Sequence, residues 1–301
     1  MKKKDIVLTQ SLLTEKEAKE ELLDFFKKQY PNGSAPIFKV LSDLQEFAST
    51  STEYLGYVEY VGYAIWLLRL FPSTQEPLVL NELTGKFIFH NGDVTIKKGV
   101  KGECFIVVNG NLNIEGNIEL TGWGKIWAKK IKAINIKANG HAIISARGAL
   151  DAENIEAEGL TEIWTQEIIN VKNITAYAYA EIWAQETINV RTIWAYDFAR
   201  IETAETVNTE NIKAEGVAEI GAEKKVHAIN ITADGWARIR TYGIIDAENI
   251  EAYDKARIWA SETIDAENIE AYDEASIWAF EKINVQNIAT YDEAEILEGE
   301  Q

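Results

Sequence analysis

A 19-residue repeat constrains the fold of this chain more than any other feature of its sequence. The repeat runs nine times without an insertion from Ile131 to Gln301, and two consecutive copies read IDAENIEAYDKARIWASET (245–263) and IDAENIEAYDEASIWAFEK (264–282). Self-similarity at a short fixed period is typical of a solenoid, in which each copy forms one coil. We number each coil 1 to 19 from its first residue, and the coils start at Ile131, Leu150, Ile169, Ile188, Val207, Val226, Ile245, Ile264 and Ile283.

The apolar pattern within a coil predicts strands. Apolar or small residues recur at positions 1, 3, 6, 8, 12, 14 and 16, and a spacing of two within each group is the period of a β-strand and not of a helix. Three strands, roughly at positions 1–3, 6–8 and 12–16, make a three-sided coil. The small, large, small alternation of Ala256, Ile258 and Ala260 suits its narrow interior. The predicted fold is therefore mainly β, a parallel three-sided β-helix (β-solenoid) with an N-terminal α-helical cap.

Two positions predict the corners of the coil. Asparagine at position 5 tolerates the left-handed backbone of a sharp corner, and its side chain can bond to its own backbone or to the Asn of the next coil. Thr192 is the exception to a predicted structural Asn ladder of Asn135, Asn154, Asn173, Asn211, Asn230, Asn249, Asn268 and Asn287. Position 10 holds residues that accept positive φ, namely Gly140, Gly159, Gly216, Gly235, Asp197, Asp254, Asp273 and Asp292.

Three segments organise the chain: a helical capping domain (1–80), irregular opening coils of the solenoid (81–130) and nine regular coils (131–301). A capping box at Thr14 and Glu17 predicts a first helix that runs to Gln29. A second helix is expected from Pro36 to about 49–52, and a third over 53–71, which is too interrupted by charge to span a membrane. We expect the third helix to cover the open end of the first coil, because unpaired strand edges invite aggregation.

Charge separates the two halves of the chain. The net charge is −18, yet residues 1–130 hold 16 basic and 16 acidic residues, so the regular coils carry the whole excess. Such a rod repels nucleic acid. Three explanations stay open: solubility, a surface for a basic protein partner, and mimicry of DNA. No apolar stretch precedes Thr14 and Cys104 is the single cysteine, so a cytoplasmic location in a bacterium or a bacterial virus is expected.

The sequence offers little for catalysis. Its three histidines are unrelated in position, and no HExxH or GxSxG motif occurs. We therefore predict that the chain is not an enzyme and uses no cofactor. Stacked carboxylates at position 10 and position 18 have the chemistry to bind Ca²⁺. The glycine-rich nonapeptide of calcium-loaded solenoids is missing, so no metal site is predicted for the position 18 row of Glu167, Glu186, Glu205, Glu262, Glu281 and Glu300.

Aromatic rows are the most specific surface feature. Position 15 faces outward and carries Trp164, Trp183, Trp259 and Trp278. Position 9, at the second corner, carries Tyr177, Tyr196, Tyr253, Tyr272 and Tyr291. Stacked aromatic pairs stabilise neighbouring strands by about 0.2–1 kcal/mol each, which is a sufficient structural reason for the rows. Exposed rows of this kind also bind protein partners or sugars.

The phrase AYDxAxIWA (252–260 and 271–279) resembles the AYDNAxVxAY-type arrays of uncharacterised bacterial and phage solenoid proteins. In those proteins a short helical head with a WLL-type segment, here AIWLLRLF at 64–71, precedes the repeats. The resemblance implies the same architecture and brings no activity with it. Bactofilins, which also stack short parallel coils and polymerise, are a weaker resemblance.

These observations favour a non-enzymatic interaction or scaffold protein that contacts a partner through its Trp and Tyr rows. The second hypothesis is a self-assembling structural protein, because the last coil (283–301) has no capping element after it and its edge can pair with a second copy to form a homodimer. The third is an acidic inhibitor that mimics nucleic acid. Binding to nucleic acid or to a membrane is not expected.

Overall fold

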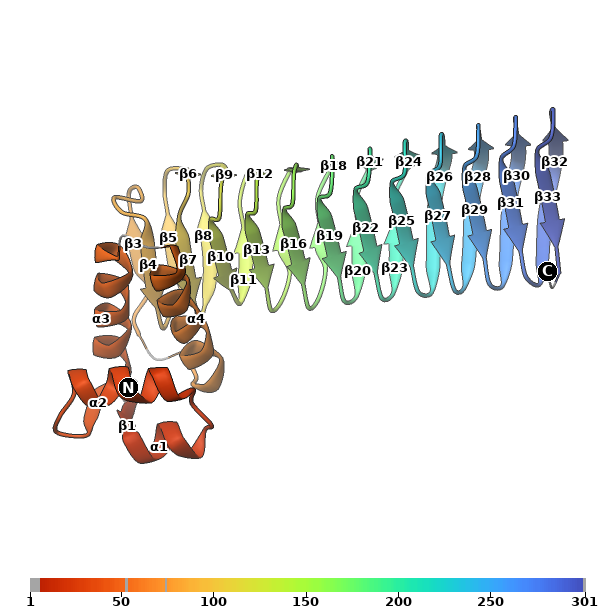
Figure 1. Cartoon of the computed structure of the whole chain (residues 1–301). Coiled ribbons are helices and arrows are strands. Elements are labelled where there is room, and N and C mark those ends of the chain that lie inside the picture. The colour runs from red at the N-terminus through yellow and green to blue at the C-terminus, as the bar shows by residue number, and fades with distance from the viewer. Residues whose placement is uncertain (1–5, 52–53, 74, 300–301) are drawn as a thin grey trace.

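The computed structural model describes residues 6–51, 54–73 and 75–299, and most of them form a long parallel β-solenoid with helices at its N-terminal end (Figure 1). Each coil contributes to two sheets, both parallel, so the predicted solenoid of 19-residue coils is confirmed. The 12-stranded sheet of the described residues consists of β4 (Phe87–His90), β7 (Phe105–Val108), β10 (Lys125–Ala128), β13 (Ile143–Ala146), β16 (Glu162–Thr165), β19 (Glu181–Ala184), β22 (Arg200–Thr203), β25 (Glu219–Ala222), β27 (Arg238–Thr241), β29 (Arg257–Ala260), β31 (Ser276–Ala279) and β33 (Glu295–Glu298).

The other two sides of the coil belong to one 19-stranded sheet. Its strands in the described residues are β3 (Leu78–Leu80), β5 (Val94–Ile96), β6 (Val100–Gly102), β8 (Asn111–Ile114), β9 (Ile118–Leu120), β11 (Lys130–Lys132), β12 (Asn135–Ala138), β14 (Leu150–Asp151), β15 (Asn154–Ala157), β17 (Ile169–Asn170), β18 (Asn173–Ala176), β20 (Thr187–Asn189), β21 (Thr192–Ala195), β23 (Thr206–Asn208), β24 (Asn211–Ala214), β26 (Lys225–Ala233), β28 (Ile244–Ala252), β30 (Thr263–Ala271) and β32 (Lys282–Thr290).

The inward positions of the repeat form the core. In the coil that starts at Ile245, the side chains of Ile245, Ile250 and Ile258 are at most 1% exposed. Ile245 pairs in register with Ile264 of the next coil, so identical side chains stack along the axis. This stacking buries a row of large aliphatic side chains, mostly isoleucine, on each side of the coil, and the apolar surface removed from water is what stabilises the rod.

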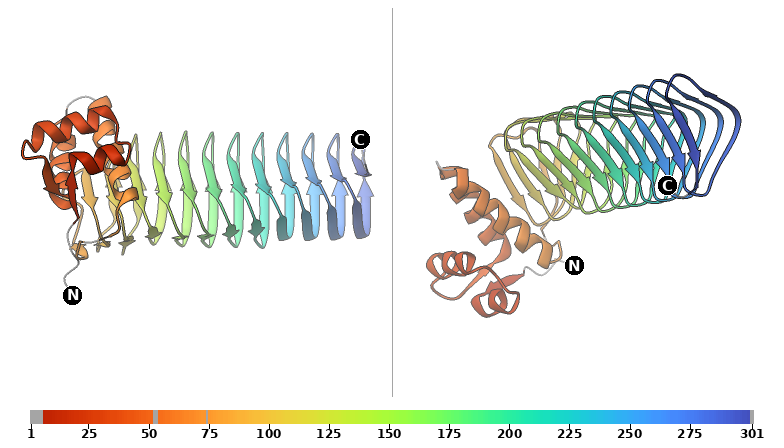
Figure 2. Two further views of the ribbon diagram at one scale, coloured as in Figure 1. Left: turned by 90° about the horizontal axis from the view of Figure 1, so that it is seen from below. Right: turned by 45° about the vertical axis from the view of Figure 1, so that its right-hand side comes forward.

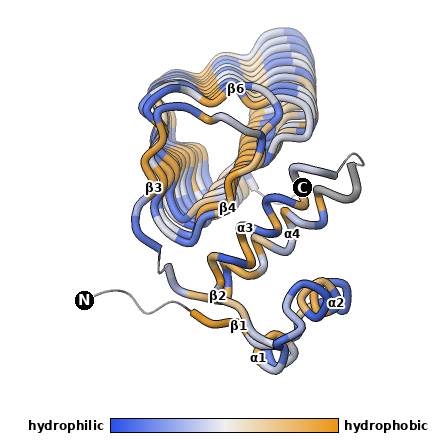
Figure 3. Tube along the Cα trace, turned by 90° about the vertical axis from the view of Figure 1, so that its left-hand side faces the viewer, coloured by the Kyte–Doolittle hydropathy of each residue, from blue (hydrophilic) through white to orange (hydrophobic). Residues whose placement is uncertain are grey.

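The sequence predicted two separate strands at positions 1–3 and 6–8 of every coil, and the later coils differ from this. From β26 onward the two strands join into single strands of nine residues. The burial alternation slips at positions 4 and 5, which both face outward, as at Glu248 and Asn249. A slip of this kind bends a strand without ending it. Seen along its axis, the solenoid still has a three-sided outline (Figure 3).

The two corners differ in backbone conformation. Every described residue at position 10 of the regular coils has positive φ, and this includes Ala178 as well as the predicted Gly and Asp residues. No described Asn has positive φ, so the left-handed explanation for position 5 was wrong. The Asn residues lie at outward strand positions and act through their side chains.

A hydrogen-bonded Asn ladder runs along position 5. The side-chain amide of each Asn donates to the amide oxygen of the Asn in the preceding coil, at distances of 2.6–3.0 Å. The ladder joins Asn117 to Asn135, Asn154 and Asn173, stops at Thr192 and resumes at Asn211. A second ladder, not predicted, follows position 2 from Asp151 through Asn170, Asn189 and Asn208. Both rows tie neighbouring coils together outside the core.

The N-terminal helices are α1 (Gln10–Glu15), α2 (Glu20–Gln29), α3 (Ile37–Thr50) and α4 (Tyr54–Leu70), with a small antiparallel pair of β1 (Val7–Thr9) and β2 (Ser34–Pro36). The predicted capping box is wrong. The Thr9 hydroxyl accepts a hydrogen bond from the Leu12 N–H and caps α1, whereas Glu17 has positive φ and lies between α1 and α2. None of the described helices has the length and apolar character needed to cross a membrane.

The helices cover a side of the solenoid and not its end. Phe87 and Phe89 of β4, Phe105 of β7 and Trp127 of β10 point out of the coil and are at most 8% exposed, because they pack with the cores of the helices. Figure 3 shows α3 and α4 beside β4 while no helix crosses the opening of the first coil, and Figure 2 shows the rod extending away from them. The expected position over the open end is therefore corrected.

The boundary between the two parts also moves. The helical domain was predicted to reach residue 80, but α4 ends at Leu70 and β3 already pairs with β5, with Leu78 opposite Val94. The chain therefore enters the solenoid by Leu78. The opening coils are irregular, as paired residues are 18 apart at Ile88 and Ile106.

Candidate interaction surface

The outer face of the 12-stranded sheet is formed by positions 13 and 15 of the coils. Its first three strands are covered by the chain's own helices, and Trp127, at position 15 of β10, is 1% exposed there. From β16 onward no described helix covers the face, and the side chains at the same positions contact solvent. One sheet face therefore continues from an internal interface to an open surface.

The predicted tryptophans lie on this open part as two pairs. Trp164 is in register with Trp183, and Trp259 is in register with Trp278. The ring centroids of Trp259 and Trp278 are 6.2 Å apart, and their ring planes are inclined at 45°. Trp183 is 36% exposed and the other three are half-buried. The two pairs are separated by three coils, so the structure does not bring all four together.

A charged cluster fills the gap between the pairs. Arg240 forms ion pairs with Glu202, two coils away, and with Glu219. Arg200 pairs with Glu202 at 3.0 Å. Gly221 lies beneath this cluster, and a Cβ there would be 3.5 Å from Arg240 Cγ. The absent side chain leaves room for Arg240 to reach across the coil.

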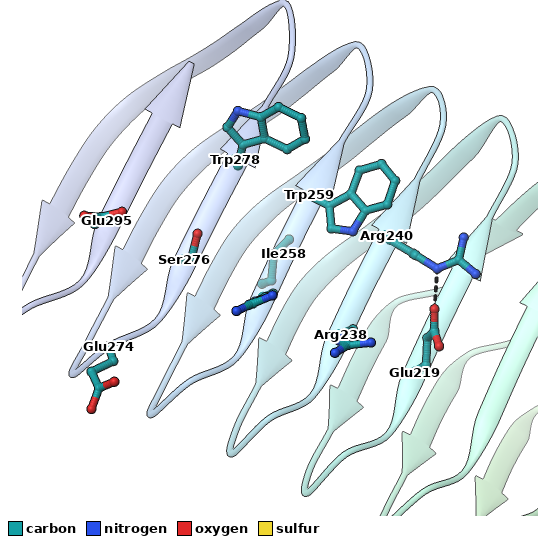
Figure 4. A pocket seen from close by; sticks show the side chains of 10 residues that line it. Glu219, Arg238, Arg240, Ile258, Trp259, Glu274, Ser276, Trp278 and Glu295 are labelled. Atoms are coloured by element: carbon teal, nitrogen blue, oxygen red, sulfur yellow. Dashed lines mark hydrogen bonds and ion pairs between the residues drawn. The ribbon is translucent and has the colours of Figure 1, made fainter. Parts of the chain in front are cut away.

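An open groove of 740 Å³ borders this cluster and the second tryptophan pair (Figure 4). Arg238 and Arg257 line it side by side in register, and both are exposed. Neither forms an ion pair with any part of the chain that the structure describes. Trp259 and Trp278 lie along one side of the groove, above Ser276 and Glu295. The groove thus offers two free guanidinium groups beside two indole rings.

The tyrosines form separate stacks at position 9. Tyr177 and Tyr196 have centroids 5.2 Å apart and nearly parallel rings, and Tyr253, Tyr272 and Tyr291 continue the pattern at 4.8 and 4.6 Å. Within the described ranges no ring contact joins these tyrosines to the tryptophans of position 15. The two predicted rows are therefore two surfaces on different sides of a corner.

The Tyr253 hydroxyl is expected to lose its proton at a higher pH than an ordinary tyrosine. Burial, followed by the hydrogen bond that its hydroxyl donates to Glu251 (2.9 Å), raises the pKa of Tyr253 to about 12. Since the folded pKa is above the ordinary value of about 10, the stabilising contribution of this phenol is complete below pH 10 and is lost as pH rises toward 12. A difference titration of phenolate absorbance between wild type and Tyr253→Phe should have its midpoint near 12 and move toward 10 in a Glu251→Gln background; a midpoint near 10 in the wild type contradicts the assignment.

Sequence reasoning missed the most exposed apolar row, which lies at position 11. We call it the apolar ridge. Seven consecutive coils contribute to it, and Lys255, whose ammonium lies 5.0 Å from the Trp236 ring centroid, follows in the next coil. Its members are Trp123 (44% exposed), His141, Leu160 (52%), Tyr179 (55%), Phe198 (52%), Val217 (43%) and Trp236 (56%).

The ridge is ordered by stacking and borders the outer face. The rings of Trp123 and His141 are 3.9 Å apart and parallel, and those of Tyr179 and Phe198 are 4.9 Å apart. At about 4.8 Å per coil the ridge is roughly 29 Å long. Its six half-exposed apolar side chains present on the order of 500 Å² of apolar surface, as much as the largest patch on a typical soluble monomer.

The carboxylate rows at positions 10 and 18 form no metal-binding group within the described residues. Among residues 6–51, 54–73 and 75–299, no three His, Cys, Asp or Glu side chains converge in a way that holds a metal ion. Glu205 of the position 18 row pairs with Lys224 at 2.5 Å. Glu300 of the same row lies outside the described residues.

Searches against protein-family models, curated proteins and solved structures find no match to this chain. The resemblances to repeat arrays and to bactofilins therefore stay predictions.

Proposed function

We propose that this chain is a non-enzymatic cytoplasmic scaffold that binds a protein partner along the apolar ridge and the neighbouring outer face of the 12-stranded sheet. The observation that carries the proposal is the ridge itself, an apolar row repeated in seven consecutive coils of an otherwise acidic rod. Solvent-exposed rows of this size are a cost to solubility unless a partner covers them.

The covered part of the same sheet supports this assignment. Phe105 and Trp127 lie at outward positions of β7 and β10, and both are buried by helices of the chain itself. Trp164 and Trp183 occupy, in β16 and β19, the position that Trp127 holds in β10. The face therefore binds apolar protein surface at one end and presents the same residue type, uncovered, farther along.

Charge adds specificity to the contact. The rod is acidic as a whole and favours a basic partner at long range. Arg238 and Arg257 depart from this at close range, because they place two cations with no ion-pair partner among the described residues beside Trp259 and Trp278. A partner that follows the ridge toward this groove is expected to place carboxylates there, with its remaining contact surface basic.

The test compares variants of two exposed surfaces. Tyr179→Ser with Phe198→Ser alters the ridge, and Trp259→Ser with Trp278→Ser alters the groove. Ile134→Ser with Ile229→Ser is the matched control, since these side chains are 45% and 39% exposed but lie at position 4. A partner purified with the wild type from native cells should bind the control with unchanged affinity and the ridge variant at least about tenfold more weakly.

The outcome separates the hypotheses. Equal affinity of wild type and ridge variant for the purified partner contradicts the proposed site. Light scattering on the isolated chain addresses self-assembly: a mass that grows with concentration and is unchanged by the ridge substitutions favours the structural role. Loss of mass growth in the ridge variant alone instead makes a second copy the partner of the ridge.

A further inference from the structure

We propose that a pocket at the junction of the helices and the solenoid, formed by Arg69, Lys129 and Arg147, binds a phosphate group. The pocket has a volume of 530 Å³ and lies where α4 ends against the coils. Its three cations come from separate segments: the last turn of α4, the residue after β10 and the residue after β13. This site is independent of the apolar ridge and of the proposed function.

Two of the cations are held against one aromatic ring. The guanidinium carbon of Arg147 lies 4.8 Å from the centroid of Trp127, and that of Arg69 lies 5.7 Å from it. The Nη2 of Arg147 also donates to Asn109, to the backbone oxygen at 3.1 Å and to Oδ1 at 2.7 Å. The Arg147 guanidinium is thus positioned before any ligand arrives, with that of Arg69 beside the same ring.

The arrangement leaves positive charge and a donor unused. The Nε of Arg147 is buried and has no hydrogen-bond partner among the described residues. Arg69, Lys129 and Arg147 form no ion pair within that same part of the chain. Burial and, after it, the charge of Arg69 both lower the pKa of Arg147, in keeping with the place of both cations in the lining of one pocket. An anion placed there relieves the repulsion.

The charge balance favours a dianion. Asp93 is the one acidic residue among the described lining residues, and its Oδ1 already accepts the Asn111 N–H at 2.7 Å. The nearby Phe71 carbonyl at the end of α4 is likewise engaged, by the Asn109 side-chain amide at 2.7 Å. Three cations and one carboxylate leave a net charge of +2. A phosphate monoester carries about −2 at pH 7 and accepts paired guanidinium donors, whereas a carboxylate neutralises half of this charge.

Calorimetric titration of the full chain with inorganic phosphate, in chloride buffer of equal ionic strength, tests the site. The wild type should bind phosphate. Lys129→Met and Arg69→Met should each bind phosphate at least about tenfold more weakly, because each removes a charge-assisted donor. Both side chains are exposed, so these substitutions spare the packing that Arg147 makes on Trp127. Lys130→Met is the matched control: it removes the same charge from the next residue, which does not line the pocket.

Three results would overturn the proposal. One is no heat of phosphate binding beyond that of chloride. Another is equal phosphate affinity of wild type, Lys129→Met and Arg69→Met. The third is acetate binding as tight as phosphate, which contradicts the assignment of a dianion.

Discussion

A version of the chain that begins at Pro72 is expected to form larger species than the full-length chain at the same concentration. Truncation uncovers the outward side chains of Phe87, Phe89, Phe105 and Trp127, which the helices keep at most 8% exposed. It also removes Gln45, whose side-chain oxygen accepts the Phe89 N–H at 2.9 Å on the edge strand β4. Roughly 400 Å² of newly exposed apolar surface corresponds to about 10 kcal/mol of transfer free energy, enough to drive association.

Sedimentation velocity measures the effect, and a rescue variant tests its cause. In uncovered coils, positions 13 and 15 hold acidic residues such as Glu162 and Glu202. The truncated chain with Phe105→Glu and Trp127→Glu should therefore return to the mass of a monomer. The same two substitutions in the full-length chain should loosen the helices from the solenoid. A truncated chain that sediments as a monomer without rescue would show that the helices do not protect this face.

Loss of one rung of the Asn ladder is expected to lower the stability of the rod by about 2 kcal/mol. Asn249 donates to Asn230 and accepts from Asn268, both at 2.8 Å, so Asn249→Ala removes two hydrogen bonds that each contribute about 1 kcal/mol. Thr192 is the natural gap in the ladder, between Asn173 and Asn211. Thr192→Asn should close it with two new hydrogen bonds and raise stability by about 2 kcal/mol.

Urea denaturation midpoints compare these variants. Glu248→Ala is the matched control for Asn249→Ala, because Glu248 is its exposed neighbour at an outward position of the same strand. Opposite shifts for Asn249→Ala and Thr192→Asn, with little change for the control, are expected. If Asn249→Ala and Glu248→Ala shift the midpoint equally, the ladder adds nothing beyond strand propensity.

The solenoid was predictable because its information is local and repeated. In each of the nine regular coils an isoleucine lies two residues from a small inward residue, at the same positions. A stack of strands in register is one of the few arrangements that bury all of these isoleucines. The role of Asn at position 5 was predictable only in part, since a hydrogen-bonded ladder and a left-handed corner call for the same residue type. The backbone decides between them, and the ladder holds at Asn135 without positive φ.

The sequence does contain an indication that the helices cover a side of the first coils, but the search for a 19-residue period overlooks it. FIF at 87–89 and FIVV at 105–108 are continuous apolar runs, which are typical of strands buried on both faces. The apolar ridge was missed for a different reason: position 11 changes from Leu160 to Tyr179 to Phe198, so no single residue type repeats. The pocket of Arg69, Lys129 and Arg147 has no sequence signal, because packing of α4 on the coils brings it together.

Because the coils are equally spaced, the length of the solenoid changes in fixed steps of one coil. Coils 245–263 and 264–282 pair through identical inward residues at the same positions, from Ile245 opposite Ile264 to Ala260 opposite Ala279. Duplication or loss of 19 codons within this region adds or removes one step of about 4.8 Å and leaves every kind of contact intact. An insertion or deletion of a single residue within a strand instead shifts its inward residues outward. The distance between the two tryptophan pairs is therefore adjustable during evolution only in whole coils.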